Sequence, residues 1–164
     1  MLVGGDIADF EYNLNKGGNF QMEIDPKAAW FIQDNLALGA YVNFGLATAK
    51  EAGTGIDYGV GALARYYVSP KDFDVLKHTR LFFEGNVGIE GSNPAVGSNT
   101  NGLGLGVGPG LAYFVTPNIG LEGLLKYNGI VGFGSSATTS KLSLQIGFQI
   151  YLPSKKIQST IQNP

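Results

Sequence analysis

Residues that could support catalysis are few in this sequence. The chain of 164 residues contains one histidine, His78, and no cysteine. Thiol nucleophiles, disulfides and cysteine-ligated metals are therefore excluded, and nucleophilic catalysis by serine has a single imidazole available as its base. The serines expected in loops have no histidine near them in the sequence: Ser92, Ser135 and Ser136. We expect no catalytic residues and predict that the protein is not an enzyme.

Two other patterns resemble ligand sites but are better explained structurally. The glycines from Gly102 to Gly110 recur every second residue, whereas a dinucleotide-binding motif needs its third glycine three positions after the second, at the start of a helix. Asp72 and Asp74 lie near His78, and a charged turn is the simpler interpretation than a weak metal site. We therefore expect no cofactor and no bound metal.

The elements that must position the remaining polar residues are strands. Apolar residues alternate with polar or small ones, most clearly from Leu142 to Leu152, and no segment sustains a helical period. Residues 1–14 join this pattern if a bulge near Ala8–Asp9 reverses the side-chain direction. Tight turns are expected at 33–35 and 116–118, polar loops at the other end, and one longer charged connection at 69–79. Eight strands are predicted, at residues 1–14, 18–31, 36–48, 55–68, 80–91, 102–115, 119–132 and 140–152.

Composition and strand length indicate a membrane barrel and not a soluble one. The chain is 44% hydrophobic and 15% charged, with a net charge of −2 and 25 glycines, which argues against disorder and against nucleic-acid binding. Strands of about 12–14 residues are roughly twice the usual soluble length and are long enough to cross a bilayer. The side of each strand that carries the apolar residues then faces lipid, and the glycine row lines a narrow interior. Aromatic residues gather at the short-turn ends as an interfacial girdle: Trp30, Phe31, Tyr66, Tyr67, Phe82, Phe83, Tyr113, Phe114 and Tyr151.

Charged residues within the predicted strands have the opposite parity to the apolar ones. This places them in the lumen, where opposite signs at similar depth should pair. Arg65 should face Glu84 across two neighbouring strands, with Glu122 and Lys27 at a similar height. The predicted lumen network consists of Glu23, Asp25, Lys27, Arg65, Glu84, Glu122 and Lys126, and Asp57, Arg80, Glu90 and Lys141 share its parity.

The pattern resembles the OmpA-like eight-stranded outer-membrane β-barrels. The segments at 30–39 and 113–121 carry the resemblance, because each places a tight turn between an aromatic strand end and a new alternating strand. The resemblance implies an all-β, antiparallel up-and-down transmembrane barrel over residues 1–152 in the outer membrane of Gram-negative bacteria, with termini and short turns in the periplasm. Residues 153–164 are expected to form a polar periplasmic tail. Because the N-terminus lacks the basic region and apolar core of a signal peptide, we expect that the signal has been removed.

The function that these expectations favour is a non-enzymatic structural element, anchor or partner subunit that displays loops outside the cell. A small gated channel for ions or small solutes is the first alternative, and a soluble barrel that carries apolar ligands is the second. Outer-membrane lipid is the expected partner. Other envelope proteins could bind the loops or the tail, and nucleic acid is not expected.

Overall fold

The polypeptide forms strands throughout its regular structure, as the alternating pattern predicts. The computed structural model describes residues 1–13, 17–18, 22–49, 53–68, 78–94, 98–133 and 138–152. Within these ranges no helix has the length and apolar character needed to span a membrane. The strands are β1 (Leu2–Asn13), β2 (Gly17–Gly18), β3 (Met22–Gln33), β4 (Leu36–Ala49), β5 (Gly53–Tyr67), β6 (Thr79–Asn93), β7 (Thr100–Thr116), β8 (Ile119–Gly132) and β9 (Thr138–Tyr151).

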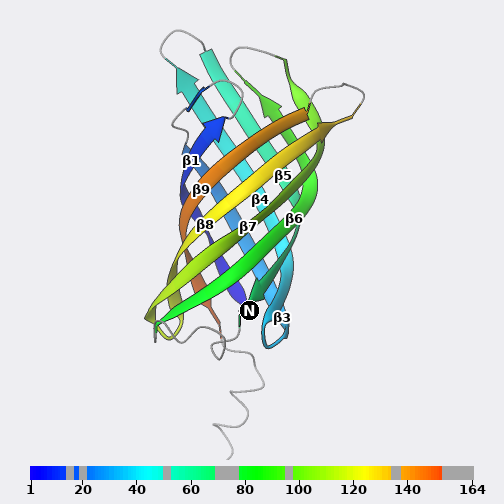
Figure 1. The fold of residues 1–164 in the computed structure, drawn as a ribbon. Coiled ribbons are helices and arrows are strands. Elements are labelled where there is room, and N and C mark those ends of the chain that lie inside the picture. Colours follow the sequence, from blue (N-terminus) through cyan, green and yellow to red (C-terminus); the bar gives the residue numbers. More distant parts are fainter. Residues whose placement is uncertain are drawn as a thin grey trace, which may run out of the picture.

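The sheet closes on itself. Its order is β1-β3-β4-β5-β6-β7-β8-β9, every neighbouring pair is antiparallel, and β9 pairs again with β1. The two-residue strand β2 pairs only with the end of β1. The long strands therefore form an eight-stranded up-and-down barrel, and Figure 1 shows them tilted around a common axis. This confirms the predicted fold class, and closure leaves no sheet edge to be satisfied in lipid.

Local irregularities lie close to their predicted places. The β1–β9 register shifts between Asp6 and Ala8, slightly before the expected bulge. Asp34 and Asn35 form the tight turn between β3 and β4. At the β7–β8 turn the Thr116 hydroxyl accepts the N–H groups of Asn118 and Ile119, at 3.3 and 3.0 Å. The predicted loop at 92–101 is shorter than expected because β6 and β7 extend into it, and residues 69–77 and 153–164 lie outside the described part of the chain.

The outer face of the barrel is apolar, whereas the inner face carries the buried charged and polar side chains together with small apolar clusters. Along β7 the side chains alternate between buried and exposed, and the exposed ones are mainly Leu, Val and Tyr. Among the exposed aromatic residues, Trp30, Tyr66, Phe83 and Tyr113 are 51–55% accessible, as expected of a girdle facing the membrane interface. The apolar face thus points outward, and the alternative of a soluble carrier with an apolar interior is wrong.

The predicted girdle is partly wrong, because residues adjacent in a strand face opposite sides of the sheet. Tyr151 turns its hydroxyl into the lumen, where it bonds to Tyr67 and Glu122. Tyr67 and Phe82 are fully buried inside the barrel, and rings of Phe31 and Phe114 pack against Tyr151. The aromatic residues at this end therefore form two layers, one facing lipid and one filling the lumen.

Glycines on the inner face of β7 make room for large side chains on its neighbours. A methyl group at Gly110 would overlap the ring of Phe82, and one at Gly104 would overlap the carboxylate of Glu90. At Gly106 it would meet Asn86, Asn128 and Lys126. The glycine row thus allows an eight-stranded barrel, whose interior is narrow, to hold several bulky polar residues.

This packing predicts opposite outcomes for two glycines on neighbouring strands. Gly110→Ala should destabilise the barrel by about 1–3 kcal/mol, the usual cost of overpacking a filled interior. Gly123→Ala is the matched control, because nothing lies within 4 Å of an added methyl group there, and it should be neutral or slightly stabilising. Reversible unfolding in detergent or lipid measures both. Equal losses at the two positions would contradict the space-making role of Gly110.

Candidate functional site

The candidate site is the interior of the barrel, where the structure gathers the charged residues. Of the predicted network, Asp25, Lys27, Arg65, Glu84, Glu122 and Lys126 are all buried in the lumen. The side chain of Glu23 lies outside the described residues. Arg80 has the inward parity but sits at the rim and is exposed. Asp57, Glu90 and Lys141 line a crevice at the loop end.

Arg65 on β5 bridges two carboxylates on different strands. β5 and β6 are in register at Arg65 and Glu84, and the guanidinium donates to the Glu84 Oε2 from Nε at 2.9 Å and from Nη2 at 2.6 Å. Its Nη1 donates to both oxygens of Glu122 on β8, at 2.9 and 2.7 Å. The predicted Arg65–Glu84 pair is confirmed. Because β5 and β8 are not neighbours, this arginine also ties opposite parts of the wall together across the lumen.

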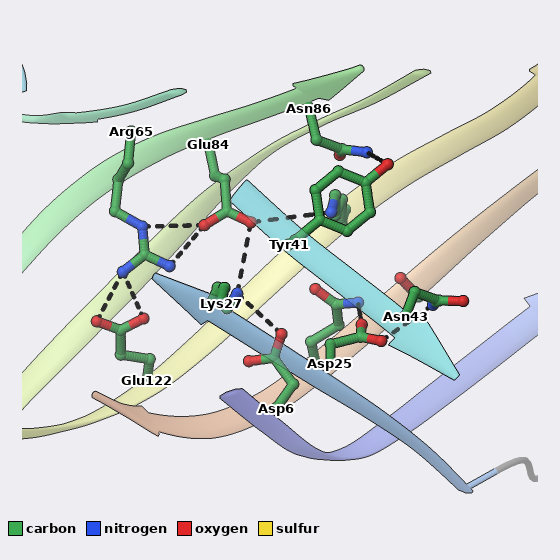
Figure 2. Close-up of polar contacts among 12 residues, drawn as sticks. Asp6, Asp25, Lys27, Tyr41, Asn43, Arg65, Glu84, Asn86 and Glu122 are labelled. Carbon is green, nitrogen blue, oxygen red and sulfur yellow. Dashed lines mark hydrogen bonds and ion pairs between the residues drawn. The ribbon is translucent and has the colours of Figure 1, made fainter. Parts of the chain in front are cut away.

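Glu84 is the centre of the ionic cluster that Figure 2 shows. Its Oε1 lies 3.4 Å from the Lys27 Nζ and 3.8 Å from the Lys126 Nζ. Lys27 pairs in addition with Asp6, at 2.9 Å. The six residues of the cluster, Asp6, Lys27, Arg65, Glu84, Glu122 and Lys126, carry three negative and three positive formal charges. A buried cluster whose charges cancel and whose members bond to one another avoids the large cost of an isolated buried charge.

An aromatic layer lies against the ionic cluster on the side of the short turns. The guanidinium carbon of Arg65 lies 4.1 Å from the centroid of the Phe82 ring. The ring centroids of Phe82 and Tyr67 are 5.7 Å apart, and those of Phe114 and Tyr151 are 5.0 Å apart. The hydroxyls of Tyr67 and Tyr151 lie 2.7 Å apart, and Tyr151 donates to Glu122 at 2.7 Å. The hydroxyls join the aromatic layer to the charges above it, so the two layers form one plug.

The other side of the cluster faces a polar crevice. Asn43 donates to Asp25 at 3.0 Å, and Gln145 donates to the second oxygen of Asp25 at 3.2 Å. Tyr41 donates to Glu90 at 2.5 Å and accepts from Asn86 at 3.0 Å. Asp25, Tyr41, Asn43, Glu90 and Gln145, with Lys126 and Asn128, line a small hollow that opens to solvent. Among the described residues, the lumen thus has a hollow on the loop side of the cluster.

Several residues of this interior were not predicted. Asp6 alternates with Val3, Gly5 and Ile7, so its parity could have placed it in the lumen. The neutral residues Tyr41, Asn43, Asn86, Gln145 and Gln149 share the inward parity as well, but polarity alone did not distinguish them from other polar positions. Only the register between strands shows which of them meet.

Of the residues considered for catalysis, His78 and Ser92 lie in the described part of the chain, at opposite ends of the barrel. His78 is exposed at the short-turn end, where its carbonyl accepts the N–H of Phe114 at 2.7 Å. Ser92 lines the loop-side crevice, while Ser135, Ser136, Asp72 and Asp74 lie outside the described residues. In the part of the chain that is described, no three His, Asp or Glu side chains come together in a way that could hold a metal ion.

Comparison with solved structures places this architecture among known barrels. Neisserial surface protein A matches with a TM-score of 0.69 and 17% identity, over 92% of this chain and 96% of that one. The attachment invasion locus protein Ail of Yersinia pestis matches with a TM-score of 0.53 and 11% identity, over 91% and 96%. The outer membrane enzyme PagL matches with a TM-score of 0.52 and 12% identity, over 93% and 100%. The fold is that of the eight-stranded outer-membrane barrels.

The resemblance inferred from the strand pattern is confirmed at the level of the fold. Neither the scan against protein-family models nor the search of curated proteins gave a match. At these identities the likeness extends to the architecture alone, and the same architecture is used by an enzyme as well as by surface proteins. Function must therefore be argued from the lumen and the surfaces of this chain.

Proposed function

We propose that the protein is a non-enzymatic barrel of the bacterial outer membrane whose lumen is plugged, and that it serves as an anchor that holds its loops outside the cell. The observation that carries this proposal is the continuous plug. Arg65, Glu84 and Glu122 cross the lumen with bonds of 2.6–2.9 Å, and the aromatic layer lies beneath them. A wide aqueous pore needs many more strands than eight, since eight leave an interior that side chains just fill.

The absence of enzymatic activity is supported by the distribution of nucleophiles and bases. The only histidine of the sequence is at the short-turn end, whereas an attack on lipid in the outer leaflet would need a base near the loop end. Ser92 faces the crevice among carboxylates, amides and lysines, none of which is the imidazole that usually activates a serine.

The proposed location predicts two kinds of contact. Outer-membrane lipid would cover the apolar face, and envelope proteins would bind the loops or residues 153–164. Heat-dependent mobility on SDS gels of protein extracted from membranes with detergent tests the location, because folded barrels migrate differently before and after boiling. Recovery of the protein in buffer without detergent would contradict it.

Conductance in planar lipid bilayers tests the plug. The wild-type barrel should show no ohmic steps, whereas Arg65→Ser combined with Tyr67→Ser and Phe82→Ser should open a water-filled path and produce them. Heat-dependent mobility of the triple variant provides the control for folding. Regular ohmic steps from the wild-type protein would instead favour the small gated channel, in which the polar crevice is one mouth of a pore.

A further inference from the structure

Among the described residues, an ion pair that is more exposed than those of the plug spans the crevice at the loop end. The Nζ of Lys141 on β9 lies 3.7 Å from the Oδ2 of Asp57 on β5. In the closed order of the barrel these two strands are on opposite sides of the lumen, and both residues line the crevice. The pair therefore runs across the lumen above Asp25, Glu90 and Lys126.

Exposure to solvent separates this pair from the ion pairs of the plug below it. The Lys141 and Asp57 side chains are 18% and 15% exposed, whereas those of Arg65 and Glu84 are 0% and 2% exposed and lie 2.6 Å apart. An ion pair that reaches solvent contributes little and weakens as salt is added, because mobile ions screen it. A dry pair with several short hydrogen bonds is held much more firmly against separation.

We propose that Asp57 and Lys141 form a reversible strap across the loop-side mouth, and that its opening admits small hydrophilic solutes to a chamber that ends at the Arg65–Glu84–Glu122 plug. The chamber wall consists mainly of carboxylates, amides, two phenols, a serine hydroxyl and two lysines, with Asn43, Glu90 and Asn128 among them, and it includes the apolar Ile130. This mainly polar wall suits water, ions and small polar molecules better than an acyl chain. The strap is independent of the proposed function, since it controls access to the crevice whether or not the plug conducts.

The absence of cysteine from the natural sequence makes the strap testable with single reporters. Asn128→Cys places a thiol in the chamber wall, and Gln149→Cys places one at a fully buried position two residues before Tyr151. Each is treated in detergent with methyl methanethiosulfonate, an uncharged reagent, and modification is followed by mass. Heat-dependent gel mobility verifies that each variant is folded.

The thiol at position 128 should be labelled about two- to fivefold faster in 0.5 M salt than in low salt. An exposed ion pair favours the closed mouth by about this factor, and salt screens the pair. When Asp57→Asn is added, the rate should equal the high-salt rate at both salt concentrations. Lys141→Gln should have the same effect, and it serves as the test if the Asp57 variant folds poorly. The thiol at position 149 should stay unlabelled throughout, because the plug remains closed.

The matched control is Asp34→Asn, which makes the same change of charge in the turn at the opposite end of the barrel. It should leave the rate at position 128 unchanged. A labelling rate at position 128 that does not change with salt, or that does not change when Asp57 or Lys141 is replaced, would contradict the proposed strap. Equal acceleration by Asp34→Asn would also overturn it, because the effect would then belong to net charge.

Discussion

Replacing Arg65 or Glu84 singly by methionine is expected to destabilise the barrel by about 3–5 kcal/mol, the cost of leaving a buried charge without its partner. The structure shows why the loss should be large on both sides. Without Arg65 the carboxylate of Glu122 loses two hydrogen bonds and keeps the one from the Tyr151 hydroxyl, and without Glu84 the ammonium groups of Lys27 and Lys126 lose a common acceptor. Each single variant also leaves the cluster with one unbalanced charge.

The double variant Arg65→Met, Glu84→Met should recover part of this loss. It returns the cluster to two negative and two positive charges, and it replaces a buried pair by apolar side chains, a change that is often close to neutral. Recovery should be incomplete, because Glu122 still lacks its arginine. Reversible unfolding of the four proteins gives the coupling energy, which should reach about 1–3 kcal/mol for residues in one network.

A second cycle provides the control for this interpretation. Asp57 and Lys141 are 3.7 Å apart and partly exposed, so the cycle of Asp57→Asn and Lys141→Met should give a coupling below about 1 kcal/mol. If the Arg65–Glu84 cycle gave a coupling near zero as well, the lumen would be a hydrated interior in which each charge is separately solvated. That outcome would favour the channel over the anchor.

Much of the barrel could be predicted from the sequence because successive side chains of a strand point to opposite faces of the sheet. Once the apolar parity is assigned to lipid, every charged strand residue must face the lumen, and a tight turn fixes which residues of two strands are level. The strands of Arg65 and Glu84 are joined by the longer connection at 69–79, so counting from it places Phe83 or Glu84 level with Arg65. The lumen-facing alternation selects Glu84, and the register confirms it. Two-residue turns such as Asp34–Asn35 were equally informative, because their residue types are specific.

Parity is less informative where several strands meet. The contacts of Arg65 with Glu122, and of Lys27 with Glu84, cross the lumen between strands that are not neighbours. These contacts depend on strand tilt and on the length of each side chain, neither of which can be counted along the chain. The error at Tyr151 has a different cause: its position at a strand end suggested the girdle, although its place in the alternation directs it inward.

A lysine on the outer face near the middle of a strand should be far more damaging than one at the next residue. Ile146 is 44% exposed on the lipid-facing side, whereas the adjacent Gln145 is 3% exposed and donates to Asp25 at 3.2 Å. Ile146→Lys should cost about 2–4 kcal/mol, as measured for cations placed on the lipid face of such barrels near the bilayer midplane. Gln145→Lys should cost much less, because its ammonium would lie beside the Asp25 carboxylate.

The comparison is direct because the two positions lie side by side on one strand, at nearly the same depth, and both receive a lysine. They face opposite sides of the barrel wall. Unfolding in lipid vesicles, followed by the fluorescence of Trp30, the single tryptophan, measures both variants against the wild type. Val60→Lys repeats the outward substitution on β5, where Val60 is 58% exposed. Equal losses at positions 145 and 146 would mean that the apolar face is not the one in contact with lipid. A large loss at Ile146 and Val60 with a small one at Gln145 would support a wall with hydrocarbon outside and polar groups inside.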